Sequence, residues 1–471
     1  ATTLMEAACF TLFLAAFGLG LWREGYRLPR WVAWPVLAFV AWTLFQVLPL
    51  PPAVLGILSP GTHAAYQRFL PGYAGSASEA DLEAFLKNRN DDSHESLQAR
   101  SDEKTGLEGV MLLRPGWRPI SWYPWQTALW LSRFLAYAAF ALLIVACLPP
   151  RALERRLPWF VLVLGSGLSL QGILQYFSWN GKILWVVPVY QGHPFGPFVN
   201  SNHFSGLVEM ALPLGCGLVL REAGFGSTRR RRRRTLRSAA PRVVLGLFLL
   251  LPMLVALVLA YSRGGMFSLA LVGCVYFGLQ ALRLGDPSAR RGTARILVAI
   301  APLLVCGAVI AGYITFFGKD VPAASRVEPS FGMRVRAWRG VLDMIRLNPV
   351  TGTGLGTFAL SYPYKKTYGE TEIWEQAHND YLQVICESGL IGFTIFLVGL
   401  GFLFRHRLRP LLAGPWRDQQ PVLLGAALAV MVLLVHSLVE FNLQIPSNGL
   451  LFTLLGGLLL AGHPAEKTDA A

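Results

Sequence analysis

The sequence is poor in charge and lacks several patterns that mark soluble or metal-dependent enzymes. Only 15% of its 471 residues are Asp, Glu, Lys or Arg, whereas 54% are hydrophobic. The 6 cysteines lie in or beside apolar runs without CxxC spacing, which predicts small buried side chains rather than a zinc site or a disulfide framework. There is no DxD pair, and His378 has no second histidine at metal-ligand spacing, so we expect no catalytic divalent metal.

The sequence also lacks the patterns that mark a nucleotide cofactor or a nucleic-acid partner. The triplet Gly352, Gly354 and Gly356 follows no predicted strand and has neither GxGxxG nor P-loop spacing, so it predicts a turn and no nucleotide cofactor. The net charge is +15, but aromatic residues are not interleaved with the basic ones as stacking platforms. Basic loops on the cytoplasmic side of a membrane explain this charge better, and we expect no nucleic-acid partner.

What the sequence does contain is a series of apolar runs of about 17–25 residues, the length of a membrane-spanning helix. The mean hydropathy of the chain is +0.45. The runs predict an all-α polytopic membrane protein with 11 spans, near residues 3–21, 31–50, 125–148, 158–177, 203–220, 243–262, 265–282, 296–316, 385–404, 421–438 and 447–462.

Arginine-rich loops give the predicted orientation. Five of them alternate onto one side, which the positive-inside rule assigns to the cytoplasm; they are the loops that begin near residues 23, 151, 221, 283 and 405. The run Arg229–Arg234 is interpreted as a topogenic, lipid-contacting loop. Residue 1 then lies outside and the C-terminus inside. Because the chain starts with Ala, we expect either a missing first helix, which would give about 12 spans, or a removed signal peptide.

The predicted organisation has five parts. They are N-terminal spans over 1–50, a periplasmic insertion over 51–124, spans with a basic cytoplasmic loop over 125–242, a core over 243–395 that includes a second periplasmic segment over 317–384, and C-terminal spans over 396–471. The middle of the insertion, from Ser76 to Glu108, is too poor in apolar residues to form its own core. Aromatic residues near Trp117, Trp122 and Trp125 predict anchoring at the membrane interface.

Several polar side chains are predicted at or beyond the outer ends of helices, which indicates a site that opens to the periplasm. They are Asn200, Asn202, His203, Arg263, Arg334, Arg336, His378, Glu440 and Asn442. The stretch from Ser330 to Phe393 holds much of this chemistry. A cationic segment between spans is costly unless it lines a site, so function is expected there first.

Arg334 and Arg336 lie on a predicted amphipathic helix, indicated by the spacing of Arg334, Trp338, Val341 and Ile345 and ended by Asn348-Pro349. Guanidinium groups bind phosphate oxygens bidentately and keep their charge, which suits them to hold a diphosphate. The equally good alternative is a basic helix that lies on anionic lipid.

Two other arginines have open roles. Arg263 lies in a Ser-Arg-Gly-Gly turn between spans, whose glycines permit a sharp reversal and the close approach of another group. It either contributes to a site or extends to lipid headgroups. Arg133 lies inside a span, where a charge is usually functional or paired, and Glu209 is a possible structural partner.

His378, in Ala-His-Asn-Asp-Tyr, has two possible roles. A neutral imidazole could accept a hydroxyl proton, whereas a protonated one could pair with phosphate. Asp380 either orients this imidazole or caps the helix that follows.

Taken together, these segments resemble the O-antigen ligase and O-antigen polymerase superfamily of membrane glycosyltransferases. The matching motifs are Phe198–Phe204 (FVNSNHF), Ser262–Gly265 (SRGG), Arg334 with Trp338, Asn348–Phe358 (NPVTGTGLGTF), Ala377–Leu382 (AHNDYL) with Glu387–Gly392 (ESGLIG), and His436–Pro446 (HSLVEFNLQIP). The family's core domain is expected over about 243–395.

The resemblance implies a GT-C-like fold of about 12 helices in the bacterial inner membrane. It also implies an inverting, metal-independent transfer of a glycan from a polyprenyl-diphosphate-linked donor to an acceptor hydroxyl on the periplasmic side. On that model Arg263 and Arg334 hold the departing diphosphate, Arg133 assists, and His378 acts at the acceptor hydroxyl. Further substrate-binding candidates are Arg336, Asn200, His203, Asn379, Asp380, His436 and Glu440.

The identity of the acceptor stays open at this point. The acceptor is a growing glycan in a polysaccharide polymerase, lipid A-core in a ligase, and a protein in an O-oligosaccharyltransferase. The motif His436–Pro446 favours a polymerase of O-antigen or exopolysaccharide. The alternative from another class, a carrier of inorganic carbon or another small solute, predicts internal repeats with broken helices, which the sequence does not show.

Overall fold

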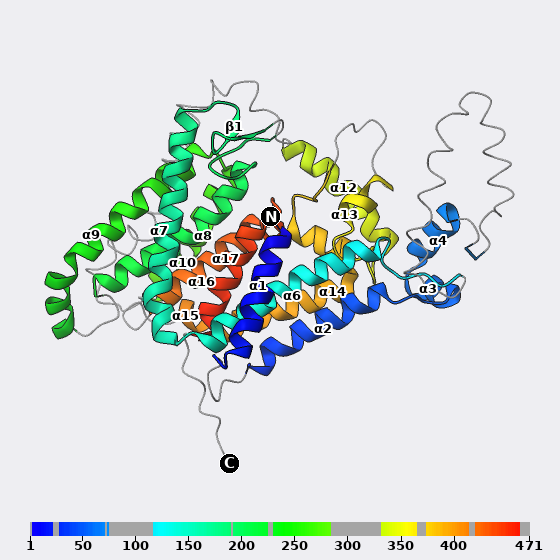
Figure 1. Cartoon of the computed structure of the whole chain (residues 1–471), viewed down its shortest axis with the longest axis horizontal. Coiled ribbons are helices and arrows are strands. Elements are labelled where there is room, and N and C mark those ends of the chain that lie inside the picture. Colours follow the sequence, from blue (N-terminus) through cyan, green and yellow to red (C-terminus); the bar gives the residue numbers. More distant parts are fainter. Residues whose placement is uncertain are drawn as a thin grey trace, which may run out of the picture.

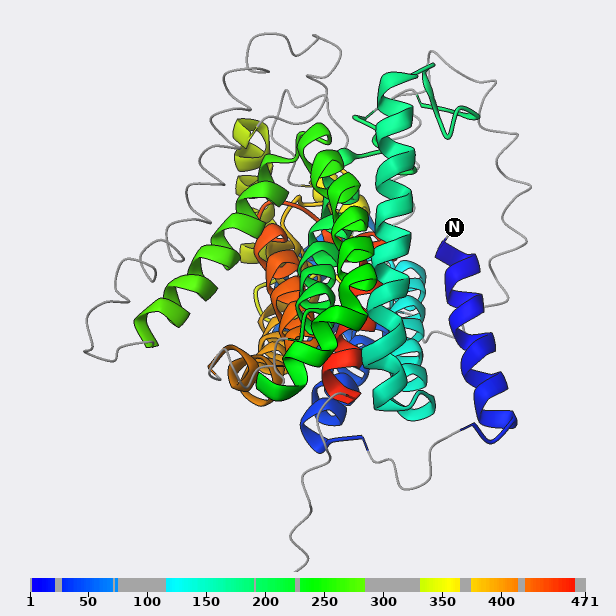
Figure 2. The ribbon, with the colours of Figure 1, turned by 90° about the vertical axis from the view of Figure 1, so that its left-hand side faces the viewer.

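The computed structural model describes residues 2–21, 28–70, 73–74, 116–189, 192–224, 229–283, 331–364, 374–413 and 420–461. These residues form a bundle of helices, shown in two views in Figures 1 and 2. Its long helices are α1 (Thr2–Gly18), α2 (Arg30–Val47), α6 (Pro124–Cys147), α7 (Pro150–Phe177), α8 (Ser201–Glu222), α9 (Arg229–Leu259), α10 (Arg263–Arg283), α12 (Phe331–Leu347), α14 (Asp380–Leu403), α16 (Pro421–His436) and α17 (Pro446–Ala461).

Helices cover the predicted spans wherever the structure describes them. Ten of the predicted ranges coincide with helices, and the remaining one, 296–316, lies outside the described residues. Six of the described helices are long and apolar enough to cross a membrane: 30–47, 124–147, 153–177, 201–222, 240–259 and 380–413. Shorter apolar helices cover 3–18, 263–278, 421–436 and 446–461. The chain is therefore an all-α polytopic membrane protein.

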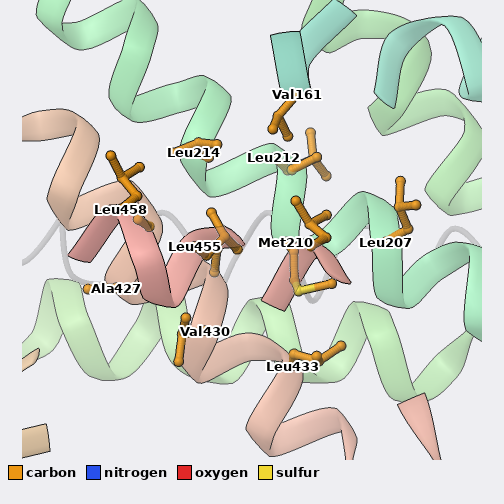
Figure 3. Close-up of a cluster of buried hydrophobic side chains, with 14 of the residues drawn as sticks. Val161, Leu207, Met210, Leu212, Leu214, Ala427, Val430, Leu433, Leu455 and Leu458 are labelled. Carbon is orange, nitrogen blue, oxygen red and sulfur yellow. The ribbon is translucent and has the colours of Figure 1, made fainter. Parts of the chain in front are cut away.

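The centre of the bundle is the pair α8 and α16. Glycines let their backbones approach closely, since a Cβ on Gly217 would lie 2.2 Å from the carbonyl oxygen of Pro421, and one on Gly425 would lie 2.4 Å from that of Pro213. Around this contact lies one continuous apolar core, in which side chains of α7, α8, α16 and α17 interdigitate (Figure 3). Helix α1 stands at the margin of the bundle, where it packs on α6 (Figure 2).

Shorter elements lie along the upper and right-hand margins of the bundle in Figure 1. They are α3 (Pro52–Leu58), α4 (Pro60–Phe69), the hairpin of β1 (Lys182–Ile183) and β2 (Val187–Pro188), α12, α13 (Phe358–Ser361), η5 (Tyr362–Tyr364) and η7 (Asn442–Gln444). The element η6 (Phe404–Leu408) is a π-helical turn that leads into α15 (Arg409–Ala413).

Two expectations differ from the structure. The run Arg229–Arg234, expected as a loop, begins helix α9, in keeping with the high helix propensity of arginine. Helix α7 starts at Pro150, before the predicted 158, and Pro158 lies inside it. Trp122 donates from its indole nitrogen to the Thr62 hydroxyl over 2.9 Å, and Trp125 is 76% exposed. The anchoring of these residues at the membrane interface stays a prediction.

Candidate functional site

The candidate site is built around Glu440, which follows α16 and is 1% exposed. Its Oε1 accepts hydrogen bonds from Asn202 Nδ2 over 2.7 Å and from an Arg334 guanidinium nitrogen over 2.5 Å. Its Oε2 lies 3.2 Å from His378 Nδ1 and 3.9 Å from His203 Nε2. We call these five residues the Glu440 cluster. It unites side chains from α8, α12 and the chain just before α14.

Arg334 is held against this loop by two contacts. Besides its bond to Glu440, its second terminal nitrogen donates to the carbonyl oxygen of Val439 over 2.8 Å. Arg334 lies on the inner face of the amphipathic helix α12 and is 9% exposed, whereas Arg336 is exposed. Two residues along a helix turn the side chain by about 200°, so one arginine faces the cluster and the other faces away from it.

His378 is aimed at Glu440 by the backbone that precedes α14. It has a left-handed conformation, with φ of 48°, that few non-glycine residues adopt. Asn379 then caps α14, because its Oδ1 accepts from the amide of Leu382 over 3.0 Å, while its Nδ2 donates to the Leu438 carbonyl over 2.8 Å. The start of α14 is thereby tied to the same loop that carries Glu440.

Asp380 has a different role from either predicted one. The residue that caps α14 is Asn379, and the carboxylate that contacts His378 is Glu440. Asp380 is 2% exposed, and its Oδ2 accepts from the amide of Leu443 over 3.1 Å. Its own amide donates to the Ser437 carbonyl over 3.0 Å. These bonds fasten α14 to the segment on both sides of Glu440.

The surroundings of Glu440 keep it ionised. Burial by itself raises the pKa of a carboxyl, but the hydrogen bond with His378 and the charge of Arg334 outweigh burial and hold the pKa of Glu440 well below its usual range. An ionised carboxylate can only accept hydrogen bonds. The proton of the neutral His378 ring therefore belongs on Nδ1, which leaves the lone pair of Nε2 directed away from Glu440.

Aromatic rings pack against the imidazoles of the cluster. The ring of Phe441 lies edge-on between His203 and His378, with centroid separations of 4.4 Å and 4.7 Å. Trp374 meets His378 edge-on at 5.5 Å. The His378 side chain keeps 13% of its surface exposed. These contacts restrict its rotation while leaving part of the ring accessible.

A second, fully buried pair lies close to the cluster. His436 Nδ1 is 2.8 Å from Glu209 Oε1, and both side chains are 0% exposed. A Cβ on Gly264 would lie 2.7 Å from His436 Nε2 and 3.3 Å from a Val439 methyl, so the Ser262–Gly265 turn touches both this pair and the loop that binds Arg334. Arg263 itself is exposed at the first turn of α10.

The remaining candidates lie outside these contacts. Arg133 pairs with Glu6 of α1 over 3.2 Å and lies over the ring of Trp130 at 4.2 Å, so the predicted partnership with Glu209 is wrong. Asn200 caps α8, since its Oδ1 accepts from the amide of Asn202 over 2.7 Å.

Sequence reasoning missed the central position of Glu440, the contact made by Asn202 and the pair formed by Glu209. A signal was present, because Asn202, Ser205 and Glu209 recur at helical spacing and give the otherwise apolar α8 a polar stripe. Within the described ranges, no group of three or more His, Cys, Asp and Glu side chains is arranged to hold a metal ion.

Comparison with known proteins relates part of this chain to a family. Residues 248–397 match the family model described as O-antigen ligase, while no curated protein matches the chain. The matched segment contains Arg263, Arg334 and His378. It includes neither Asn202 nor Glu440, so the cluster joins the matched segment to residues on both sides of it.

Proposed function

We propose that this chain, a membrane glycosyltransferase of the O-antigen ligase and polymerase type, transfers a glycan from a polyprenyl-diphosphate-linked donor to an acceptor hydroxyl on the periplasmic face of a bacterial inner membrane. One observation carries the proposal. Arg334 and His378, from separate parts of the matched segment, meet on the single buried carboxylate of Glu440. Arg263 is exposed, and it lies in the turn whose Gly264 packs against Val439, in the loop that carries Glu440.

His378 is the proposed general base. With Nδ1 donating to Glu440, its Nε2 can take the proton of the acceptor hydroxyl. The hydroxyl oxygen then bonds to the anomeric carbon of the donor, while the bond from that carbon to the diphosphate oxygen breaks on the opposite face. The configuration inverts, and the diphosphate leaves with the bonding electrons. A carboxylate that orients an imidazole and balances its positive charge is a recurrent arrangement in base catalysis.

The two arginines are given different tasks. Arg263 is exposed, so its guanidinium is free to meet the phosphate oxygens as negative charge develops there. Arg334 already donates to Glu440 and Val439 and is nearly buried, so it acts mainly by holding Glu440 in place. Arg336 and Arg133 lie outside the cluster. We assign Arg336, which is exposed, to contact with lipid headgroups. We assign Arg133 to the ion pair with Glu6 that joins α6 to α1.

Among the acceptors, a growing polysaccharide is the one we propose. Glu440 and His436 lie within the segment His436–Pro446, which is the motif that favoured a polymerase, and this segment forms one wall of the cluster. Ligation to lipid A-core and transfer to protein are the alternatives. All three share the donor chemistry, so the acceptor has to be identified by the product.

The test is a deletion strain complemented with the wild type, His378→Ala, Arg263→Ala or His406→Ala, with equal membrane levels shown for each. His406 stacks on Trp31 at 4.8 Å, away from the cluster, and is the matched histidine control. We expect the first two variants to accumulate lipid-linked single repeats and the control to restore the polymer. Normal glycan from both site variants would refute the site. Polymer of normal length that stays unattached in the deletion strain would identify a ligase.

A further inference from the structure

The Glu209–His436 pair has no direct part in the proposed chemistry, yet its surroundings are unusual. A paired carboxylate and imidazole that are both 0% exposed are costly to bury unless each polar atom is satisfied. Among the described residues, Glu209 Oε2 and His436 Nε2 have no hydrogen-bond partner. Both unpartnered atoms belong to the side of the pair that faces helix α10.

The first turn of α10 covers these two atoms. A Cβ on Gly264 would lie 2.7 Å from His436 Nε2, and a Cβ on Gly265 would lie 2.8 Å from Glu209 Oε2. Real Cβ atoms essentially never approach other atoms so closely, so only glycine fits at either position without a shift of the helix or of the pair. The two glycines that follow Arg263 therefore rest directly on the buried pair.

We propose that Glu209 and His436 are positioning residues for Arg263. The pair fixes where the first turn of α10 sits, and thereby where the Arg263 guanidinium emerges relative to the Glu440 cluster. Gly264 also approaches Val439, whose carbonyl holds Arg334, so the pair, the turn and the cluster form one packed unit. The functional part of this inference rests on the proposed role of Arg263 as a diphosphate ligand; the structural part does not.

The chain offers a matched steric test on a single helix. Gly264→Ala and Gly265→Ala push a methyl group into the pair, whereas Gly273→Ala, on the same helix, meets nothing within 4 Å. With purified protein and lipid-diphosphate-linked donor, we expect the first two variants to raise KM for the donor by about tenfold, equivalent to ~1.4 kcal/mol. We expect Gly273→Ala to match the wild type. A core-filling role would instead lower the amount of folded protein and leave KM unchanged.

A second measurement is independent of activity. Nitroxide labels on Arg263→Cys and Arg336→Cys, both exposed, report the position of the α10 turn relative to α12 in a background free of the native cysteines. We expect one narrow distance distribution, which broadens or shifts with Glu209→Ala and with Gly264→Ala but not with Gly273→Ala. If Glu209→Ala does not fold, Gly264→Ala, which keeps both members of the pair, gives the result.

The outcomes separate the two proposals. Unchanged distances in Gly264→Ala overturn the positioning role, whatever the activity of that variant. Altered distances with an unchanged KM for the donor also overturn it, because Arg263 would then move without consequence for the donor. If the wild-type protein transfers no glycan, the proposed function fails, and the label distances still decide whether the pair positions the turn.

Discussion

Two buried glutamates, Glu387 and Glu440, organise neighbouring parts of this protein in different ways. Glu387, in α14, accepts hydrogen bonds from the amides of Gly356 over 2.7 Å and Phe358 over 3.2 Å. Its partners therefore include the backbone of the loop that holds Gly352, Gly354 and Gly356. Glu440 instead binds the side chains of an amide, a guanidinium and an imidazole, which come from segments 238, 106 and 62 residues away.

The difference shows how the same residue type can be structural or functional. Backbone amides are part of the main chain and do not titrate. A carboxylate that accepts their hydrogen bonds therefore fixes the shape of a loop. The glycine loop shows this directly, because Gly356 has φ of 74° and donates its amide to the Glu387 carboxylate over 2.7 Å. A carboxylate that binds ionisable side chains sets their position and charge and leaves one face of His378 accessible.

The largest expected effect is on His378. The variant His378→Ala should lower kcat for glycan transfer by about 10²–10⁴-fold, the range for loss of a general base. Its midpoint of thermal unfolding should fall less than that of Glu387→Ala, since His378 keeps part of its surface in contact with solvent. The two quantities are measured on protein purified in the same detergent. An unfolding midpoint that falls as far as in Glu387→Ala would place His378 in the scaffold.

The reciprocal prediction concerns Glu387 and Glu440 themselves. Glu387→Ala leaves two amides without their acceptor and should lower the free energy of unfolding by about 1–3 kcal/mol for each one that stays buried. Glu440→Gln keeps the volume and one acceptor oxygen, so it should lower kcat with a smaller change in unfolding. Thermal unfolding and transfer rates of both variants test this pattern. The comparison fails if Glu440→Gln is the more unstable of the two while still active.

A smaller effect is expected where the insertion meets the glycine loop. Asn348 Oδ1 accepts from the hydroxyl of Ser59 and from the amide of Thr62, each over 2.9 Å. Asn348→Ala should lower the free energy of unfolding by about 1–3 kcal/mol, because these buried donors lose their acceptor. The exposed Asn180→Ala is the control, with an expected change of about 0.5 kcal/mol or less. Equal unfolding midpoints for the two variants would show that the flanks of the insertion are not fastened here.

The smallest effect concerns pH. Because the pKa of Glu440 is held below its ordinary value, its ionised form stabilises the fold above the unfolded-state pKa, near ~4.3, and this stabilisation is lost as the pH falls through the lower folded value. The stabilisation that the ionised carboxylate gives the wild type over Glu440→Gln should therefore shrink as the pH falls below about 4. A difference in unfolding midpoint that does not shrink between about pH 4 and 3 would contradict the lowered pKa of Glu440.

The sequence predicts the helices better than the side-chain contacts between them. Apolar runs mark helices because each span satisfies its own backbone, so the signal is local. The amphipathic helix of Arg334 and its end before Asn348 are local signals too, and the structure confirms both. Partners are not local. Glu209 is a possible partner of Arg133 by sequence alone, but it contacts His436, 227 residues away, and no periodicity links those two positions.

The position of Glu440 in the chain has a consequence for biosynthesis. Asn202, Arg334 and His378 are synthesised before Glu440. The carboxylate that they all contact lies in the segment between α16 and α17. A nascent chain that has already threaded α14 into the bilayer therefore still lacks the carboxylate that sets the imidazole tautomer. The Glu440 cluster is therefore completed only after the residues that follow α16 have been synthesised.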